Sequence, residues 1–238
     1  MRVATWNLEW AVPGTERHGG ALRQLESVDA DIVVTTEDSL HDWEPYPHRV
    51  DGGADWGYRF VDGRRKVIAW SRSPWSDVEV VERGACRGRF VRARTVAHGV
   101  DVQVLAVCIP WRDAHVRSGR RDRTGWDEHL EFCEELGNQI DATTAEGPTI
   151  VAGDFNQRIP RGSQPLRVAE ALADCLGQVT VATSGEQQAG RLIDHIAVSR
   201  HFAVEAVQSW PNQIDGHRLT DHSGAAVEIV ADRPSAAS

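Results

Sequence analysis

The sequence feature that most constrains the fold is a short apolar run that ends in a glycine and two polar residues, Thr149-Ile-Val-Ala-Gly-Asp-Phe-Asn-Gln-Arg158. The apolar part predicts a buried strand, and Gly153 allows the backbone to turn at its carboxyl end. Asp154 and Asn156 are two residues apart, so their side chains point the same way if the chain stays extended. The pair could hold a cation or an attacking water, or it could form an Asx turn with its own backbone.

The same pattern, a strand with polar side chains at its end, is predicted elsewhere in the chain. Residues 2–10 read as a strand with Asn7 and Glu9 near its exit, and a helix follows over residues 21–28. Residues 31–37 then form a buried strand that ends at Glu37. Further polar pairs of this kind are Asp194-His195 and Asp221-His222.

The hydrophobic pattern in the rest of the chain predicts an α/β fold with two groups of strands. Strands are expected at Lys66–Ser71, Val78–Glu82, Arg89–Ala97, Asp101–Pro110, Val179–Thr183, Leu192–Val198, Val204–Trp210 and Gly224–Val230. The short breaks among the first four predict antiparallel hairpins, and residues 40–63 read as loop. Helices are expected from the cap at Thr124 to residue 140 and over residues 165–176. These elements predict two packed mixed sheets flanked by helices.

Composition limits the class of protein. The 238 residues suit one domain, expected over residues 1–232, with a disordered tail at 233–238. The net charge of -9 argues against a broad basic surface for nucleic acid, although the arginines gather in two groups, at 83–94 and 112–123. Four widely spaced cysteines predict a reduced, cytoplasmic protein, and no 18-residue apolar run predicts a membrane span. No obligate protein partner is indicated.

Taken together, the polar clusters carry a family resemblance. The motifs are Thr5-Trp-Asn-Leu-Glu9, Thr36-Glu37, Gly153-Asp-Phe-Asn156, Ile193-Asp-His-Ile196 and Asp221-His222-Ser223. In order and rough spacing the chain resembles the endonuclease/exonuclease/phosphatase superfamily along nearly its whole length. That resemblance implies a four-layer α/β sandwich with the site at one end of the two sheets.

The resemblance also implies roles for these residues. Glu37 would be the principal ligand of Mg²⁺ or Mn²⁺, Asn7 a ligand or an orienting group, and Asp221 and Glu9 further acidic groups at the metal. Asp154 and Asn156 would bind the attacking water and a phosphate oxygen. Asp194 would orient His222, which would act either as a general base or as a donor to the phosphoryl oxygen. Hard oxygen ligands suit such ions, which offset the charge of a phosphodiester.

One position departs from the family pattern. Many members have a tyrosine or histidine where Leu105-Ala-Val-Cys-Ile-Pro110 places Cys108. A thiol is a weak donor, so stabilisation of the phosphate from this position is in doubt. Because the strand around it is apolar and no basic residue adjoins it, Cys108 is not expected to be a nucleophile.

The substrate is predicted less sharply than the chemistry. The arginine-rich loop at residues 111–123 could bind phosphate, with Arg112 and Arg120 as contacts and Trp111 stacking on a base, or it could be a solvated loop of local ion pairs. Arg158 is a further candidate phosphate contact, and Trp210 a second tryptophan to test. The leading hypothesis is a divalent-cation-dependent phosphodiesterase, with a DNA nuclease as the first guess. The alternatives are a phosphoesterase for a small soluble, sugar or lipid-headgroup phosphate, and a catalytically silent binding module.

Overall fold

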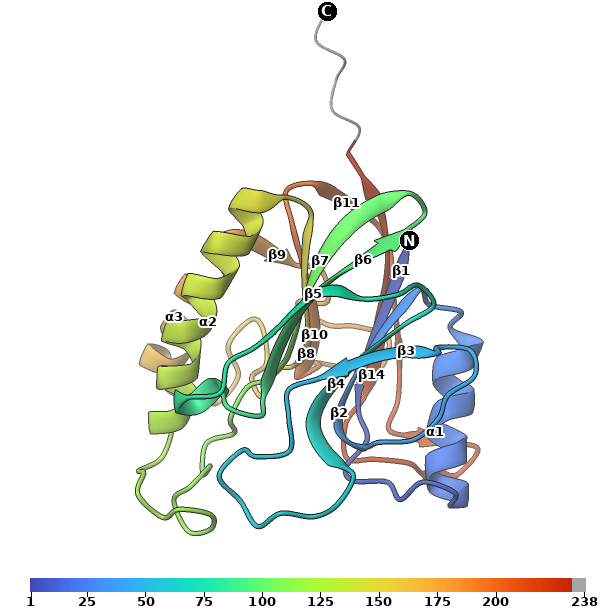
Figure 1. The fold of residues 1–238 in the computed structure, drawn as a ribbon. Coiled ribbons are helices and arrows are strands. Elements are labelled where there is room, and N and C mark those ends of the chain that lie inside the picture. Colours follow the sequence, from blue (N-terminus) through green and yellow to red (C-terminus); the bar gives the residue numbers. More distant parts are fainter. Residues whose placement is uncertain (233–238) are drawn as a thin grey trace, which may run out of the picture.

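Two six-stranded β-sheets pack face to face in the computed structural model, which describes residues 1–232 (Figure 1). The first sheet has the order β11 (Phe202–Trp210), β14 (Gly224–Ala231), β1 (Arg2–Asn7), β2 (Ile32–Ser39), β4 (Arg64–Ser71) and β3 (His48–Asp51). The second has the order β5 (Ser76–Val80), β6 (Phe90–Ala97), β7 (Val100–Cys108), β8 (Thr149–Asp154), β10 (Asp194–Ser199) and β9 (Val179–Val181). The tail predicted at 233–238 lies outside the described residues.

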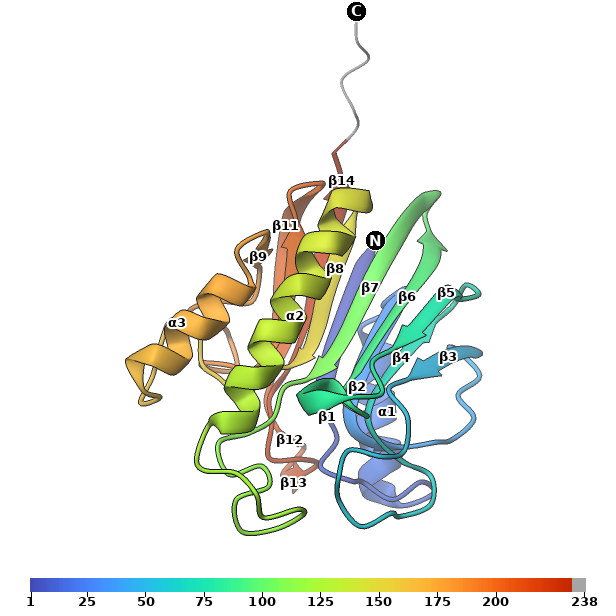
Figure 2. The ribbon, with the colours of Figure 1, turned by 60° about the vertical axis from the view of Figure 1, so that its left-hand side comes forward.

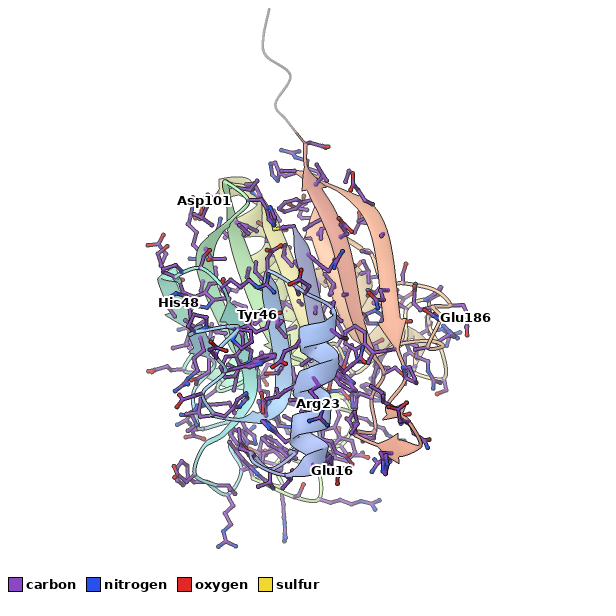
Figure 3. All side chains as sticks on the ribbon, turned by 90° about the vertical axis from the view of Figure 1, so that its right-hand side faces the viewer. Glu16, Arg23, Tyr46, His48, Asp101 and Glu186 are labelled. Carbon is purple, nitrogen blue, oxygen red and sulfur yellow. The ribbon has the colours of Figure 1, made fainter. Side chains whose placement is uncertain are left out.

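Helices cover the outer face of each sheet. Helix α1 (Glu16–Ser27) lies on the first sheet, where Figure 3 shows it with Glu16 and Arg23 labelled. The long helix α2 (Asp127–Glu146), α3 (Leu166–Cys175) and the short 3₁₀ helix η1 (Gly84–Cys86) cover the second sheet, as Figure 2 shows. The predicted four-layer α/β sandwich is therefore confirmed.

The core between the sheets is built from small and β-branched side chains. Val34 of β2, Ala106 of β7 and Ile150 of β8 belong to this layer and are essentially buried. Larger side chains fill the outer layers, for example Trp70 of β4 in the layer with α1, and Phe132 of α2 in the layer between that helix and the second sheet. Small β-branched residues on facing strands let two sheets approach closely. The strand ends of the two sheets therefore lie close together at one edge of the sandwich.

Three local predictions are wrong. The strands expected at Lys66–Ser71 and Val78–Glu82 do not form a hairpin, because β4 belongs to the first sheet and β5 to the second, so the chain crosses between sheets at residues 72–75. The expected loop at 40–63 contains the edge strand β3, which pairs with β4. A small hairpin of β12 (Gln213–Ile214) and β13 (His217–Arg218) was not expected. No helix within residues 1–232 is long and apolar enough to cross a membrane.

The strand directions bring the predicted polar ends to one edge. β1 runs parallel to β2, and β7 runs parallel to β8, so all four strands end on the same side. β10 runs antiparallel to β8, and its first residue, Asp194, pairs with the last residue of β8, Asp154. His222 precedes β14, which runs antiparallel to β1. The end of one strand and the start of its antiparallel neighbour thus face the same space.

Candidate active site

A buried hydrogen-bonded cluster connects the two sheets at this edge. The backbone N–H of Asn7 donates to Asp194 Oδ2 at 2.8 Å, and its side-chain amide donates to Asp154 Oδ2 at 3.1 Å. All three residues are at most 2% exposed. Asn7 comes from the first sheet and both aspartates from the second, so this residue fixes the position of one sheet edge against the other.

Asp154 and Asn156 converge, but not through a continued strand. β8 ends at Asp154, and Asn156 has a left-handed backbone with φ of 53°. Asp154 Oδ1 accepts the backbone N–H of Asn156 at 2.8 Å, which is an Asx turn, and Asp154 Oδ2 accepts the side-chain amide at 3.0 Å. The turn and the convergent pair were alternatives in the sequence, and here the turn produces the convergence.

The glycine before Asp154 has a different role from the expected one. Gly153 lies within β8, so the backbone does not turn there. A Cβ atom at Gly153 would lie 1.9 Å from the carbonyl oxygen of Val107 in the neighbouring strand. A side chain would therefore force apart β7 and β8, the two strands that place Cys108 beside Asp154.

His222 and Asp194, distant in sequence, form a close pair. His222 Nδ1 lies 2.9 Å from Asp194 Oδ1, and because the carboxylate accepts, Nδ1 carries the proton. The indole of Trp6 donates to the backbone carbonyl of His222 at 2.8 Å, which holds the segment before β14 against β1. His222 Nε2 is left to face the site, 3.7 Å from Asp221 Oδ1.

Glu37 has a cationic partner that the sequence analysis missed. Its carboxylate lies 2.5 Å from the ammonium of Lys66, which comes from the adjacent strand β4. Lys66 is the only lysine in the chain, since the other basic residues are arginines, and it is only 8% exposed. The available signal in the sequence was that this lysine, the single one in the chain, stands at the start of a predicted buried strand. The left-handed backbone of Glu37, with φ of 48°, interrupts β2, whose pairing with β4 resumes at Asp38.

The two other acidic candidates lie apart from the buried cluster. Glu9 is bound by two arginines, Arg17 at 3.0 Å and Arg218 at 2.9 Å. Its carboxylate charge is thus already compensated. Asp221 is exposed, and its contact with the cluster is with His222, whose Nε2 lies 3.7 Å from Asp221 Oδ1. The roles predicted for these and the other site residues stay predictions.

Burial and mutual proximity change the proton affinities of the cluster. Burial raises the pKa of Asp154 to about 7, with Asp194 and Glu37 raising it further and His222 opposing them. Burial by itself lowers the pKa of His222, but Asp194, Asp154 and Asp221 outweigh it and bring that pKa to about 10. At neutral pH the arrangement therefore holds an imidazolium beside carboxylates, one of which is able to take up a proton.

Cys108 is enclosed in the layer between the sheets. Its side chain is 1% exposed, and burial raises the pKa of the thiol to about 12. A protonated, buried thiol is a poor nucleophile, which agrees with the sequence expectation. Cys108 pairs with Asp154 across β7 and β8 in the parallel register. The residue next to it, Ile109, donates its N–H to the backbone carbonyl of Asp154 at 2.8 Å.

Two cavities adjoin the cluster. One, of about 670 Å³, is lined by Asn156 together with Arg112 and Arg158. The other, of about 340 Å³, is lined by Lys66 and by aromatic and basic side chains, namely Trp10, Trp56, Tyr58, Arg59, Arg64 and Trp111. The first therefore adjoins the Asp154 side of the cluster, and the second adjoins the Glu37 side.

Two predicted substrate contacts have other partners. The Arg120 guanidinium binds the carboxylate of Glu128 at 3.1 Å and lies 3.2 Å from the imidazole of His115, so it holds the arginine-rich loop to α2. Trp210, the second tryptophan to test, is 4% exposed and packs edge-on against Trp6, so its ring offers no open face for a substrate. Its apolar surface is used in the core under α1.

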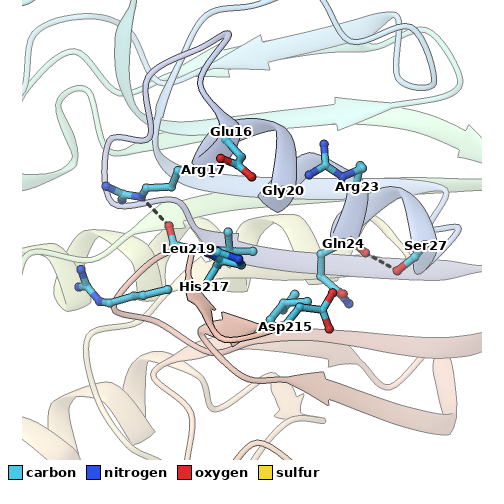
Figure 4. Close-up of a pocket in the computed structure, with 11 residues that line it drawn as sticks. Glu16, Arg17, Gly20, Arg23, Gln24, Ser27, Asp215, His217 and Leu219 are labelled. Carbon is cyan, nitrogen blue, oxygen red and sulfur yellow. Dashed lines mark hydrogen bonds between the residues drawn. The ribbon is translucent and has the colours of Figure 1, made fainter.

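A third cavity, of about 570 Å³, lies between α1 and the β12–β13 hairpin (Figure 4). Arg17 of α1 donates to the backbone carbonyl of Leu219 at its edge. Arg23 and His217 also line it, but none of the buried carboxylates does. The cavity is therefore separate from the cluster.

Known structures share this fold. The 3'-5' exonuclease NExo from Neisseria meningitidis has 19% sequence identity and a TM-score of 0.68, and the match covers 96% of this chain and 99% of that one. A 3' phosphatase NExo structure from Neisseria, bound to a product DNA hairpin, has 20% identity and a TM-score of 0.67, covering 97% and 99%. Humanized D. rerio TDP2 has 13% identity and a TM-score of 0.70, covering 97% and 99%. No curated protein matches the chain.

The sequence itself matches a family model. Residues 4–222 match the model of the Endonuclease/Exonuclease/phosphatase family, a range that includes Asn7 near its start and His222 at its end. The matched range takes in all four residues of the buried cluster, namely Asn7, Asp154, Asp194 and His222. The chain therefore belongs to the endonuclease/exonuclease/phosphatase family.

Proposed function

We propose that this protein is a divalent-cation-dependent phosphodiesterase in which a water molecule attacks phosphorus in line with the leaving oxygen, and that its substrate is DNA. The observation that carries this proposal is the buried cluster in which Asn7 bonds both Asp154 and Asp194 while Asp194 bonds His222. The cluster contains acids, amides and one imidazole at a shared sheet edge. Such a set can bind a cation, position water and donate a proton, which are the three requirements of phosphodiester hydrolysis.

The donors fit Mg²⁺ or Mn²⁺. They are carboxylate and amide oxygens, which hard cations prefer. Burial, the main cause of the raised pKa of Asp154, disfavours the bare carboxylate, and a nearby cation would stabilise it. Glu37 would be the main ligand, with Asn7 and Asp221 beside it. When bound, the cation offsets charge on the phosphate and on the leaving oxygen.

The chain supplies the proton transfers. Asp154, with a pKa near 7, accepts a proton from the attacking water. The side-chain amide of Asn156 donates to Asp154 and to the carbonyl of Ile109, and it exchanges one of these bonds to hold a phosphate oxygen. Asp194 fixes the His222 tautomer, so that the imidazolium donates from Nε2 to the phosphoryl oxygen. The raised pKa of His222 favours this donor role over the general-base role. One positioned acid or base contributes roughly 10² to 10⁴ in rate.

The surroundings of the cluster support a nucleic-acid substrate. Arg112 and Arg158 border one cavity, where their guanidinium groups can pair with phosphates. Trp111, 47% exposed, borders the other, where a base can stack. A structural neighbour is described as bound to a product DNA hairpin. The net charge of -9 favours the second candidate, a phosphoesterase for a small phosphate ester.

Hydrolysis assays with purified protein test the proposal. With Mg²⁺ or Mn²⁺ we expect cleavage of nicked or 3'-recessed duplex DNA, reduced at least 100-fold in Asp154→Ala and His222→Ala. His217→Ala, which changes an exposed histidine of the β13 strand, is the matched control and should keep full rate. Cleavage of an aryl phosphodiester or a sugar phosphate with no cleavage of DNA would select the small-ester candidate. Cation binding without turnover of any ester would identify a silent binding module.

A further inference from the structure

A second group of potential metal ligands lies between α1 and the first sheet. His18 is in the first turn of α1, Asp38 lies near the end of β2, and His41 follows in the loop after that strand. One ligand atom from each lies within 4.8 Å of the other two. The nearest approaches to Asp38 Oδ1 are 3.9 Å from His18 Nε2 and 3.9 Å from His41 Nδ1.

The group is buried and its imidazoles are incompletely paired. His18 is 3% exposed and Asp38 is fully buried. Within residues 1–232, His18 Nε2 and His41 Nε2 are both enclosed by protein and have no hydrogen-bond partner. A buried polar nitrogen without a partner destabilises the folded state, so these two nitrogens, on the histidines beside one carboxylate, indicate a ligand that supplies the missing interaction.

The backbone holds each side chain in place. Asp38 accepts the hydroxyl of Thr35 at 2.7 Å and the N–H of Ser39 at 2.7 Å, which fixes its carboxylate while leaving lone pairs free. The Nδ1 atom of His41 lies 2.8 Å from the carbonyl oxygen of Ser39, and because a carbonyl only accepts, Nδ1 is the donor. The Nε2 atom, which has no partner, is then the nitrogen of His41 that can bind a metal, as is usual for an imidazole whose other nitrogen donates to a carbonyl. The 3.9 Å contact with Asp38 is made by Nδ1, so the His41 ring has to turn toward Asp38 to share one ion with it.

A direct ion pair does not account for these contacts. At 3.9 Å the His18 nitrogen is too far from the Asp38 oxygen for a hydrogen bond. Burial, together with the neighbouring His41, lowers the pKa of His18 to about 4, so this imidazole is neutral at physiological pH. Within the described residues, no lysine or arginine reaches Asp38. The carboxylate therefore faces the neutral imidazole of His18 and has no lysine or arginine partner among the described residues.

We propose that His18, Asp38 and His41 bind a divalent transition metal of the Zn²⁺ class. Two imidazole nitrogens and one carboxylate oxygen select zinc, cobalt or nickel over the Mg²⁺ expected at the all-oxygen cluster. Ligand atoms of a tetrahedral Zn²⁺ lie roughly 3.3 Å apart, so a bound ion would draw these three atoms together by about 0.5 Å or more and join α1 to β2. Asp38 directly follows Glu37, so the ion would also fix the strand end that carries the proposed catalytic ligand. The metal site itself does not depend on the proposed function.

Metal titration of the EDTA-stripped protein in excess Mg²⁺ tests the proposal. We expect one equivalent of Zn²⁺ by isothermal titration calorimetry and elemental analysis, a rise in melting temperature, and visible d–d absorption when Co²⁺ replaces zinc. His18→Ala and His41→Ala should weaken Zn²⁺ binding at least tenfold. His217→Ala and Glu37→Gln, which leave these three ligands in place, should bind as the wild type does.

Several outcomes would overturn the site. Wild-type protein that takes up no Zn²⁺ in the presence of Mg²⁺ contradicts it, as does equal affinity in His18→Ala. If an alanine variant does not fold, Asp38→Asn and His41→Gln replace it, with circular dichroism to confirm folding. A folded Asp38→Asn that binds zinc as the wild type does would exclude the carboxylate ligand. Glu37→Gln removes only the main proposed ligand of the catalytic cation and keeps His18, Asp38 and His41. The zinc titration therefore stays valid even if the wild type hydrolyses no ester.

Discussion

The carboxylate of Glu37 lies 2.5 Å from the ammonium of Lys66. A cation at the proposed centre would need the same carboxylate, so Lys66 opposes cation binding by charge repulsion. We therefore predict that Lys66→Met binds Mg²⁺ about two- to fivefold more tightly in isothermal titration calorimetry. The range follows from the value of about 0.2–1 kcal/mol typical of partly exposed ion pairs.

Arg64→Met provides the control for this charge effect. Arg64 borders the same cavity as Lys66, but its guanidinium lies over the ring of Trp10 at 4.7 Å. Its removal should leave the Mg²⁺ affinity within twofold of wild type, and Lys66→Arg should also keep it. Unchanged or weaker Mg²⁺ binding by Lys66→Met would show that the ammonium does not compete with the cation for Glu37.

The pKa of His222, raised from 6.5 to about 10, predicts a pH-dependent stability. The native state binds this proton more tightly than the unfolded state. The stabilisation is therefore complete below pH 6.5 and is lost as the pH rises through 10. Without added metal, the free energy of unfolding of the wild type should fall between pH 7 and 10, relative to His222→Gln, by on the order of 3 kcal/mol.

Chemical denaturation in EDTA buffers measures this difference. Asp154 titrates at the lower edge of this window, because its pKa is raised from 3.8 to about 7, so the stabilisation from its proton is lost as the pH rises through 7. His217→Gln, an exposed histidine substitution, corrects for general effects of pH. Parallel stability curves for the wild type and His222→Gln from pH 7 to 10 would contradict the raised pKa.

Much of the site was predictable because its residues stand at strand ends. Apolar runs followed by Asn7, Glu37 or Asp154 indicate where a strand leaves the core, and parallel strands bring such ends to one edge. The pairing of Asp194 with His222 came from the family resemblance, since no local pattern joins residues 28 positions apart.

Other features depend on tertiary contacts that a single sequence does not display. Lys66 lies near the start of an ordinary buried strand, and only the pairing of β2 with β4 places it beside Glu37. The crossing from β4 to β5 looks like a hairpin because its break is short, and the choice of sheet is made by packing. Arg120 reads as a free cation in a polar loop, but the fold brings Glu128 to it.

The arginines near the cluster should separate into two classes. Arg112 and Arg158 line the cavity beside Asn156, so Arg112→Ala and Arg158→Ala should raise KM for a DNA substrate about tenfold without loss of stability. Arg120→Ala should instead destabilise the protein by about 1–3 kcal/mol, because it leaves Glu128 buried without its partner. Steady-state kinetics measure the change in KM, and thermal melts measure the change in stability, for each of the three variants. A KM increase in Arg120→Ala alone would reverse the assignment.

Trp111 provides the test of base stacking. Its indole is 47% exposed and lines the cavity that also contains Lys66, so a base beside the reacting phosphate can lie on its face. Stacking of one base contributes about 1–3 kcal/mol, which corresponds to roughly 5- to 150-fold in affinity. Trp111→Ala should therefore bind single-stranded DNA at least fivefold more weakly, as measured by fluorescence anisotropy in a His222→Ala background that does not cut the probe.

The same measurement needs a control for loss of exposed apolar surface. Val96 is 52% exposed and lies near the end of β6, at the opposite end of the second sheet from the cluster, so Val96→Ala should leave DNA affinity unchanged. Trp111→Phe keeps an aromatic face and should retain most of the affinity. If Trp111→Ala binds DNA as tightly as Val96→Ala does, the tryptophan-lined cavity does not hold a base, and the case for a small phosphate ester as substrate becomes stronger.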